Sequence, residues 1–142
     1  MKLTHIRNQI IKTMPMLNLD QLVSEDLTNL NRGIEKESLR VNPTGQLSQQ
    51  PHPDQLGSAL THPNITTDFS EAQLELITDT HNEVGNCLKQ LRQVHQFVSR
   101  NISSELLWCS SMPCMLPEDS RIPIAQFGDS NIARAKTVYR RG

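Results

Sequence analysis

Apolar residues recur at helical spacing along three stretches of the chain, residues 3–12, 20–30 and 83–102. An apolar side chain at every third or fourth position forms one stripe along a helix, and a helix buries such a stripe against a neighbour. We therefore predict three packing helices, of which the second could be capped by Asn18 or Asp20. The stripe is clearest in the third helix, where it consists of Val84, Leu88, Leu91, Val94, Val98 and Ile102.

Polar and apolar residues alternate along two further segments, residues 33–41 and 65–78. Successive side chains of a strand point to opposite faces, so the alternation predicts two half-buried strands, and Glu35 and Glu37 share one face of the first. In the second strand, from residue 71 onward, one face carries Glu71, Gln73 and Glu75 and the other carries Ala72, Leu74 and Leu76. Helices mixed with separate strands predict an α+β fold.

The connecting segments are polar and rich in proline. Residues 42–45 have the composition of a turn, and residues 46–53, which contain two prolines, are predicted to form a surface loop. Residues 108–123 contain three prolines and are predicted to be irregular. We interpret Cys87 and His95, both in the third helix, as core or boundary residues.

Acidic side chains give the two predicted strands a candidate chemistry. If the strands lie in one sheet with their polar faces aligned, Glu35, Glu37 and Glu75 converge. Asp68 then reaches in from the preceding turn. Crowded carboxylates repel one another unless a cation neutralises them, and their oxygen atoms suit Mg²⁺ or Mn²⁺, ions that serve phosphate chemistry. The spacing alone leaves open a solvated strand face, with the cationic side chains of the first strand pointing toward the core.

Composition narrows the classes of function. A chain of 142 residues corresponds to one domain, and its formal net charge of -1 gives no electrostatic footprint for nucleic acid. No apolar stretch approaches the ~20 residues of a membrane span, so a membrane is not an expected partner either. The three cysteines lack the spacing of metal ligands, and we expect free thiols and a cytoplasmic location.

Several ordered blocks of the sequence resemble one family, the proteobacterial type of glutamate–cysteine ligase (γ-glutamylcysteine synthetase). The similarity runs from about Arg32 to the last residue, in order and with similar spacings. The blocks are Gly33-Ile34-Glu35-Lys36-Glu37-Ser38-Leu39-Arg40-Val41, Leu56-Gly57-Ser58-Ala59-Leu60-Thr61-His62, Ile65-Thr66-Thr67-Asp68-Phe69-Ser70-Glu71, Ser111-Met112-Pro113-Cys114 and residues 125–142.

The resemblance implies a fold and a reaction. The fold would be the N-terminal portion of a glutamine-synthetase-like catalytic domain, an antiparallel sheet whose acidic strands bind metal ions, with flanking helices. The reaction would join the γ-carboxylate of L-glutamate to the amine of L-cysteine through γ-glutamyl phosphate, with ATP as co-substrate and Mg²⁺ or Mn²⁺ as cofactor, as the first step of glutathione biosynthesis.

The resemblance also implies roles for individual residues. Glu35, Glu37, Asp68 and Glu75 match positions at which the family holds its metal ions. Phe69, Tyr139 and Arg140 match positions near the amino-acid pocket, where an aromatic wall and a cation would suit cysteine. Catalytic residues and the residues that bind ATP are not assigned, and neither is the oligomeric state.

Length sets the chain apart from the family, whose members are several times longer. We expect an N-terminal helical segment, residues 1–31, followed by an incomplete part of the catalytic domain, residues 32–142, so that the chain is a fragment, inactive alone and marginally folded. The alternative is a non-catalytic accessory or degenerate module derived from the ligase N-terminus. An unrelated two-metal hydrolase is disfavoured, because no histidine near the acidic strands would activate water.

Overall fold

The computed structural model describes residues 21, 23–127 and 131–141, and it divides the chain into two compact units, Met1–Leu30 and Asn31–Gly142. In the first unit, α2 is a single short helix, Ser24–Thr28, so the helix predicted over residues 20–30 is shorter than expected. The helix predicted over residues 3–12, and both candidate caps of the second helix, lie outside the described residues. The expected domain boundary after residue 31 stays a prediction.

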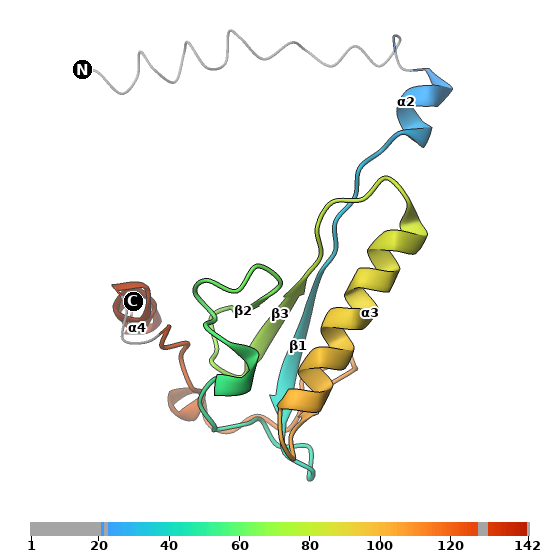
Figure 1. Ribbon diagram of the computed structural model, residues 1–142. Coiled ribbons are helices and arrows are strands. Elements are labelled where there is room, and N and C mark those ends of the chain that lie inside the picture. The colour runs from blue at the N-terminus through green and yellow to red at the C-terminus, as the bar shows by residue number, and fades with distance from the viewer. Residues whose placement is uncertain (1–20, 22, 128–130, 142) are drawn as a thin grey trace, which may run out of the picture. The chain divides into compact units, whose positions relative to one another are not determined.

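The second unit is built on a four-stranded sheet with the order β2-β3-β1-β4, in which every strand pair is antiparallel (Figure 1). The predicted α+β fold with an antiparallel sheet is therefore confirmed. The first predicted strand is β1, and the second is a hairpin of two strands with the predicted turn between them. The four strands are β1 (Glu35–Val41), β2 (Ile65–Thr67), β3 (Gln73–Ile77) and β4 (Leu106–Leu107).

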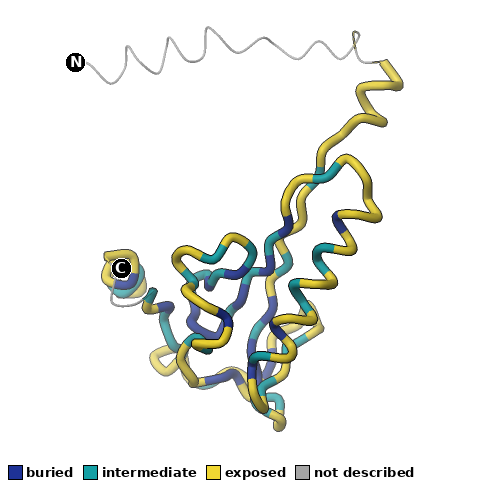
Figure 2. The backbone as a smooth tube through the Cα atoms, in the orientation of Figure 1, coloured by how far each residue is buried: buried dark blue, intermediate teal, exposed yellow. Residues whose placement is uncertain are grey.

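One face of this sheet packs against the long helix α3, Val84–Asn101, which runs alongside β1 and β3 in Figure 1. The helix begins and ends within a residue of the predicted 83–102 stretch, which confirms it. Its C-terminal half is the better buried part (Figure 2). Burial of such apolar side chains against a sheet is the main source of stability for a helix of this kind. The core cluster consists of Leu56, Ile65, Leu74, Leu76, Val98 and Ile102.

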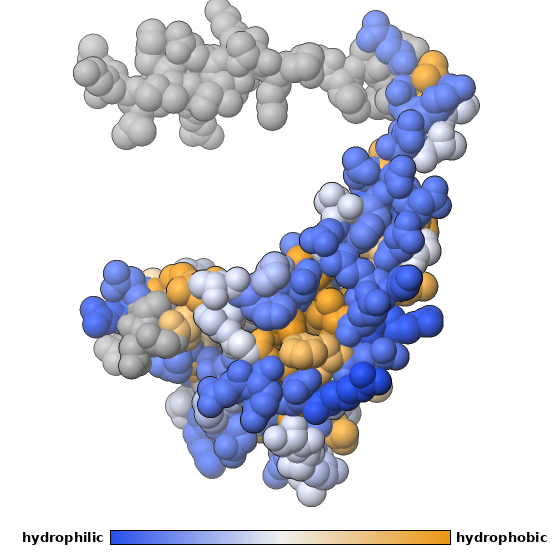
Figure 3. All heavy atoms as spheres, in the orientation of Figure 1, coloured by the Kyte–Doolittle hydropathy of each residue, from blue (hydrophilic) through white to orange (hydrophobic). Residues whose placement is uncertain are grey.

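The predicted stripe of α3 is only partly correct. Val98 is fully buried, but at the N-terminal end Val84 is 61% exposed and Leu88 is 49% exposed, while Cys87 is buried instead. Figure 3 shows hydrophobic surface between α3 and the neighbouring sheet. A shallow cleft of about 320 Å³ in this region is lined by residues of β2 and α3, including Ile65, Val94 and Phe97.

A second, smaller cluster forms where β1 ends. Val41 packs there with Leu47, Ala72 and Cys114, so both faces of this end of β1 are covered. The predicted turn at residues 42–45 is present, with Gly45 at φ 81°, a conformation that favours glycine. The prediction of a surface loop at 46–53 is only partly correct, because Leu47 and Ser48 within it are buried, whereas the residues at 46 and 49–51 are exposed.

The rest of the second unit consists of irregular segments and short helices. Residues 108–123 are largely irregular, as predicted, apart from the 3₁₀ turn η3 at Asp119–Arg121. A second 3₁₀ turn, η2, spans Asp54–Leu56, and the chain described ends with α4, Asn131–Arg141, which the apolar pattern did not predict. Among the helices of the described residues, none is both long and apolar enough to cross a lipid bilayer.

Candidate functional site: an acidic sheet face

The sheet places three of the predicted carboxylates on the face that turns away from α3. β1 pairs with β3 so that Glu37 lies directly opposite Glu75, and Glu35 lies opposite Ile77. Directly opposed residues on one face of an antiparallel pair have neighbouring side chains. Asp68 follows the end of β2, in the turn of the β2–β3 hairpin. The structure therefore brings Glu35, Glu37 and Glu75 to one face, with Asp68 at its border.

Burial and like charges act together on the carboxylates of this face. Partial burial, reinforced by the charges of Asp68, Glu37 and Glu35, raises the pKa of the Glu75 carboxyl, while Lys136 opposes the shift. Glu37 and Glu35 are exposed. A metal site and a merely solvated strand face both allow such exposure, so it does not distinguish between them. The charges of Asp68, Glu37 and Glu35 all act on Glu75, and this repulsion gives a reason for a cation at this face.

Most of these carboxylates have no side-chain partner within the described ranges. Glu37 accepts a hydrogen bond from Nε2 of Gln73 at 2.6 Å. No other side chain of the described residues forms a hydrogen bond or ion pair with the carboxylates of Glu35, Asp68 or Glu75. Oxygen donors left free in this way are those a hard divalent cation prefers. The face has the donor chemistry of a Mg²⁺ or Mn²⁺ site.

The carboxylates are not yet arranged as a closed coordination shell. Across the described ranges, no three His, Cys, Asp or Glu side chains lie close enough together to hold a metal ion as they stand. The placement of the carboxylates on one face and their negative charge therefore suit a cation. Their side chains would have to adopt other rotamers to coordinate it. Long acidic side chains at a sheet surface can make that adjustment at low cost, since staggered rotamers of exposed side chains interconvert readily.

The three residues predicted for the amino-acid pocket also come together. The rings of Phe69 and Tyr139 meet edge to face with their centroids 6.3 Å apart, and Cζ of Arg140 lies 6.0 Å from the centroid of Phe69. Nη1 of Arg140 donates to the carbonyl oxygen of Ile122 at 2.8 Å. Tyr139 is 81% exposed, so this aromatic pair with its cation forms an open wall beside Asp68 rather than a buried core.

Sequence reasoning missed one residue near the site and misplaced another. Lys136, on α4, donates a hydrogen bond to the backbone carbonyl of Asp68, and its Nζ lies 4.6 Å above the ring of Phe127. The sequence did not predict this contact, because nothing in the local pattern brings α4 to the hairpin. Glu71 was placed on the acidic face by parity, which is wrong: it precedes β3 and is only 6% exposed.

Comparison with known proteins identifies the family of this chain. The family model described as glutamate–cysteine ligase matches residues 17–142. A glutamate–cysteine ligase of Alcanivorax borkumensis is 53% identical over 127 residues, which are 89% of this chain and 24% of that protein. A ligase of Hahella chejuensis is 55% identical over 117 residues, 82% of this chain and 22% of that protein.

Two solved structures resemble the fold. A glutamate–cysteine ligase of Francisella tularensis, solved in complex with AMP, superposes with a TM-score of 0.71 and 45% identity, over 79% of this chain and 22% of that one. A bifunctional glutathione synthetase of Pasteurella multocida gives a TM-score of 0.64 and 40% identity, over 66% and 13%. The chain thus spans between 22% and 24% of the curated relatives named above. On this agreement of family model, sequence and fold, the chain belongs to the glutamate–cysteine ligase family.

Proposed function

We propose that this chain forms the cation-binding strands and one wall of the amino-acid pocket of a glutamate–cysteine ligase. The reaction is the ATP-dependent joining of the γ-carboxylate of L-glutamate to the amine of L-cysteine, through γ-glutamyl phosphate. Family membership supports the reaction, and the AMP complex of the Francisella relative supports the use of an adenine nucleotide. The single observation that carries the proposal is the like-charged face on which Glu37 lies opposite Glu75.

The residues proposed to hold Mg²⁺, or Mn²⁺ in its place, are Glu35, Glu37, Asp68 and Glu75. When bound, the cation would neutralise phosphate charge, so that the ATP γ-phosphate and the anionic carboxylate of glutamate can approach each other. Glu37 and Glu75 provide donors from two adjacent strands, and a paired sheet keeps such positions rigid. The pKa of Glu75 is raised first by burial and then by the repulsion of Asp68, Glu37 and Glu35, and a neighbouring cation would relieve that repulsion.

Phe69, Tyr139 and Arg140 are proposed to contact cysteine. The two rings present an apolar edge to a small side chain, and the guanidinium group of Arg140 offers its remaining N–H groups to the amino-acid carboxylate. Three free cysteines, Cys87, Cys109 and Cys114, support a reducing compartment such as the cytoplasm.

The proposal is tested in a hybrid ligase, in which this chain replaces the matching segment of the Alcanivorax relative. ADP release is measured with ATP, Mg²⁺, glutamate and cysteine. Glu37→Gln keeps the shape of the side chain and removes its charge, so we expect the rate to fall by roughly a hundredfold while the protein stays folded.

Glu118→Gln is the matched control, because Glu118 is exposed and its side chain makes no hydrogen bond within the described residues. An unchanged rate of the Glu37 variant at saturating Mg²⁺ contradicts its role as a ligand. A hybrid that folds but releases no ADP dependent on both amino acids contradicts the proposed reaction for this chain.

A further inference from the structure

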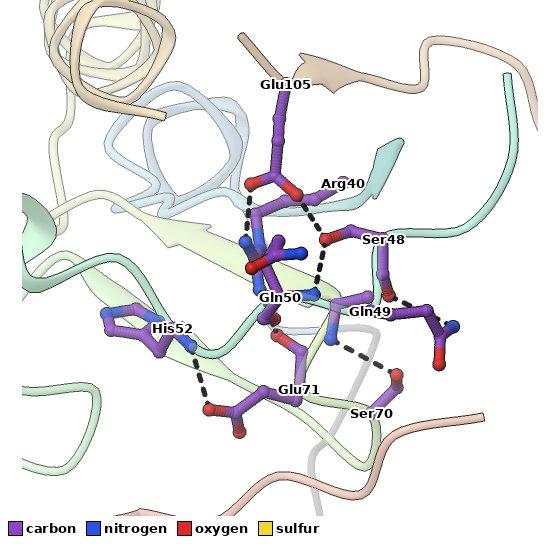
Figure 4. Close-up of polar contacts among 9 residues, drawn as sticks. Arg40, Ser48, Gln49, Gln50, His52, Ser70, Glu71 and Glu105 are labelled. Atoms are coloured by element: carbon purple, nitrogen blue, oxygen red, sulfur yellow. Dashed lines mark hydrogen bonds and ion pairs between the residues drawn. The ribbon is translucent and has the colours of Figure 1, made fainter. Parts of the chain in front are cut away.

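A network of largely buried polar groups lies near the C-terminal end of β1, and Arg40 is at its centre (Figure 4). The side chain of Arg40 is completely buried, and its Nη1 pairs with Oε2 of Glu105 at 2.5 Å. Its Nη2 donates to the backbone carbonyls of Gln50, at 2.8 Å, and Glu71, at 3.1 Å. Glu105 also accepts a hydrogen bond from the hydroxyl of Ser48. Arg40 therefore joins the segment 46–53 to the β2–β3 hairpin.

Glu71 extends this network to a third segment. Its Oε1 accepts the backbone N–H of His52 at 2.9 Å, as Figure 4 shows, and its Oε2 accepts the backbone N–H of Gln126 at 2.8 Å. A carboxylate can accept at both oxygens, whereas no neutral side chain of the same length can. With both oxygens occupied and the residue buried, Glu71 is a structural group and not a further cation ligand.

The segment held by Glu71 is the one that supports the pocket wall. Ala125 N–H donates to the carbonyl of Phe69 at 3.0 Å, and the hydroxyl of Ser70 donates to the carbonyl of Pro123 at 2.9 Å. The carbonyl of Ile122, in the same segment, accepts the hydrogen bond from Arg140. Residues 122–126 thus connect the turn that carries Phe69 with the helix that carries Arg140.

We propose that Glu71 is a positioning residue for the cysteine pocket: through two hydrogen bonds to backbone N–H groups, its carboxylate fixes residues 122–126 against the hairpin and so sets the spacing of Phe69 and Arg140. The inference takes the identity of the ligand from the proposed function. The two hydrogen bonds by which Glu71 fixes residues 122–126, called the clamp below, do not depend on that function. In Glu71→Gln one oxygen becomes an amide NH₂, which cannot accept, so either His52 or Gln126 loses its partner.

Amide hydrogen exchange of the whole 142-residue chain tests the clamp without any activity. We expect Glu71→Gln to accelerate exchange at His52 or Gln126 at least tenfold, and Glu71→Ala to accelerate it at both, while Leu74 in the core stays protected. Glu118→Gln should leave all three unchanged. Unchanged exchange at both amides in the alanine variant overturns the clamp.

Steady-state kinetics of the hybrid ligase test the consequence for the substrate. We expect Glu71→Gln to raise KM for cysteine about tenfold and to change kcat and the Mg²⁺ requirement by less than about threefold, since it weakens binding and not the chemical step. Glu75→Gln should instead raise the Mg²⁺ concentration needed for half-maximal activity. An unchanged KM for cysteine, or a Mg²⁺ requirement shifted as in Glu75→Gln, overturns the positioning role. If the unsubstituted hybrid is inactive, the proposed function fails, and the exchange measurement alone decides the clamp.

Discussion

The acidic face and the buried network both contain glutamate carboxylates, but these differ in whether they have hydrogen-bonding partners. On the face, Glu35 and Glu75 have no hydrogen-bonding partner among the described residues, and like charges surround them. In the network, Glu71 accepts two backbone N–H groups and Glu105 pairs with Arg40. Within the described part of the chain, Glu35 and Glu75 lack hydrogen-bonding partners, whereas Glu71 and Glu105 have them.

This difference distinguishes carboxylates that are available to bind a ligand from carboxylates that stabilise the fold. The presence of acidic residues alone does not distinguish them. A buried charge without a partner costs several kcal/mol, so the fold has to provide Glu71 and Glu105 with donors. An exposed carboxylate can remain unpaired in water at little cost and keeps its oxygens available. The free donors on the acidic face are therefore the ones to which a ligand can bind, whereas those of the network hold the chain together.

The largest effect on stability should come from Arg40 in the network. Arg40→Ala removes the partner of Glu105 and two hydrogen bonds to backbone carbonyls, so it should lower the free energy of unfolding by about 3–5 kcal/mol. Urea unfolding followed by circular dichroism measures the change. Arg92→Ala, at an exposed position on α3, is the control and should change stability by less than about 0.5 kcal/mol. A loss below about 1 kcal/mol in the Arg40 variant would mean that the network is not holding the segments together.

A smaller effect of opposite sign is expected on the acidic face. The pKa of Glu75 is raised, first by burial and then by Asp68, Glu37 and Glu35, so the folded chain disfavours the charged carboxylate. Stability contributed by this group therefore falls as pH rises from the ordinary glutamate range through the raised pKa, and it stays lower at pH 7. Glu75→Gln should increase the free energy of unfolding at pH 7 by roughly 0.2–1 kcal/mol, toward the lower end because the site is partly solvated.

Thermal melting at pH 7 and at a pH below the ordinary glutamate range checks this sign. The difference between Glu75→Gln and the unsubstituted chain should vanish at the lower pH, where Glu75 is protonated in both the folded and the unfolded state. Adding Mg²⁺ at pH 7 should stabilise the unsubstituted chain more than the variant. A Glu75 variant that is less stable at pH 7 would show that this carboxylate has a favourable partner, against the comparison drawn here.

The spacing of apolar and polar residues correctly predicted α3 and β1, whose structure depends mainly on residues close together in the sequence. The eighteen residues of α3 repeat an apolar spacing over several turns, and both ends were predicted within a residue. The pleat of β1 fixes the side of Glu35 and Glu37 once the segment is a strand, so the acidic face followed from alternation. The alternation suggested a divalent cation for that face but left a solvated strand face open, and the family resemblance favoured metal binding.

The remaining parts depend on contacts between residues far apart in the sequence. Parity placed Glu71 on the acidic face because the alternation continues through it, yet the hairpin turn ends only where β3 begins, at Gln73. The partner of Arg40 lies 65 residues away, and no local pattern indicates it. The segment 46–53 is polar in composition, which predicted a surface loop, but contacts with distant residues bury Leu47 and Ser48 within it.

The central claim, that the acidic face and not the buried network binds the divalent cation, is tested most directly by titrating the ¹⁵N-labelled chain with Mn²⁺ and following paramagnetic broadening of backbone amide signals. We expect the signals of Glu35, Glu37 and Glu75 to broaden at the lowest Mn²⁺ concentrations, excess Mg²⁺ to reverse the effect, and Glu37→Gln to shift it to higher concentrations while Glu118→Gln does not. Broadening that begins around Glu71 or Glu105, or that is the same in the Glu37 variant, would contradict the account.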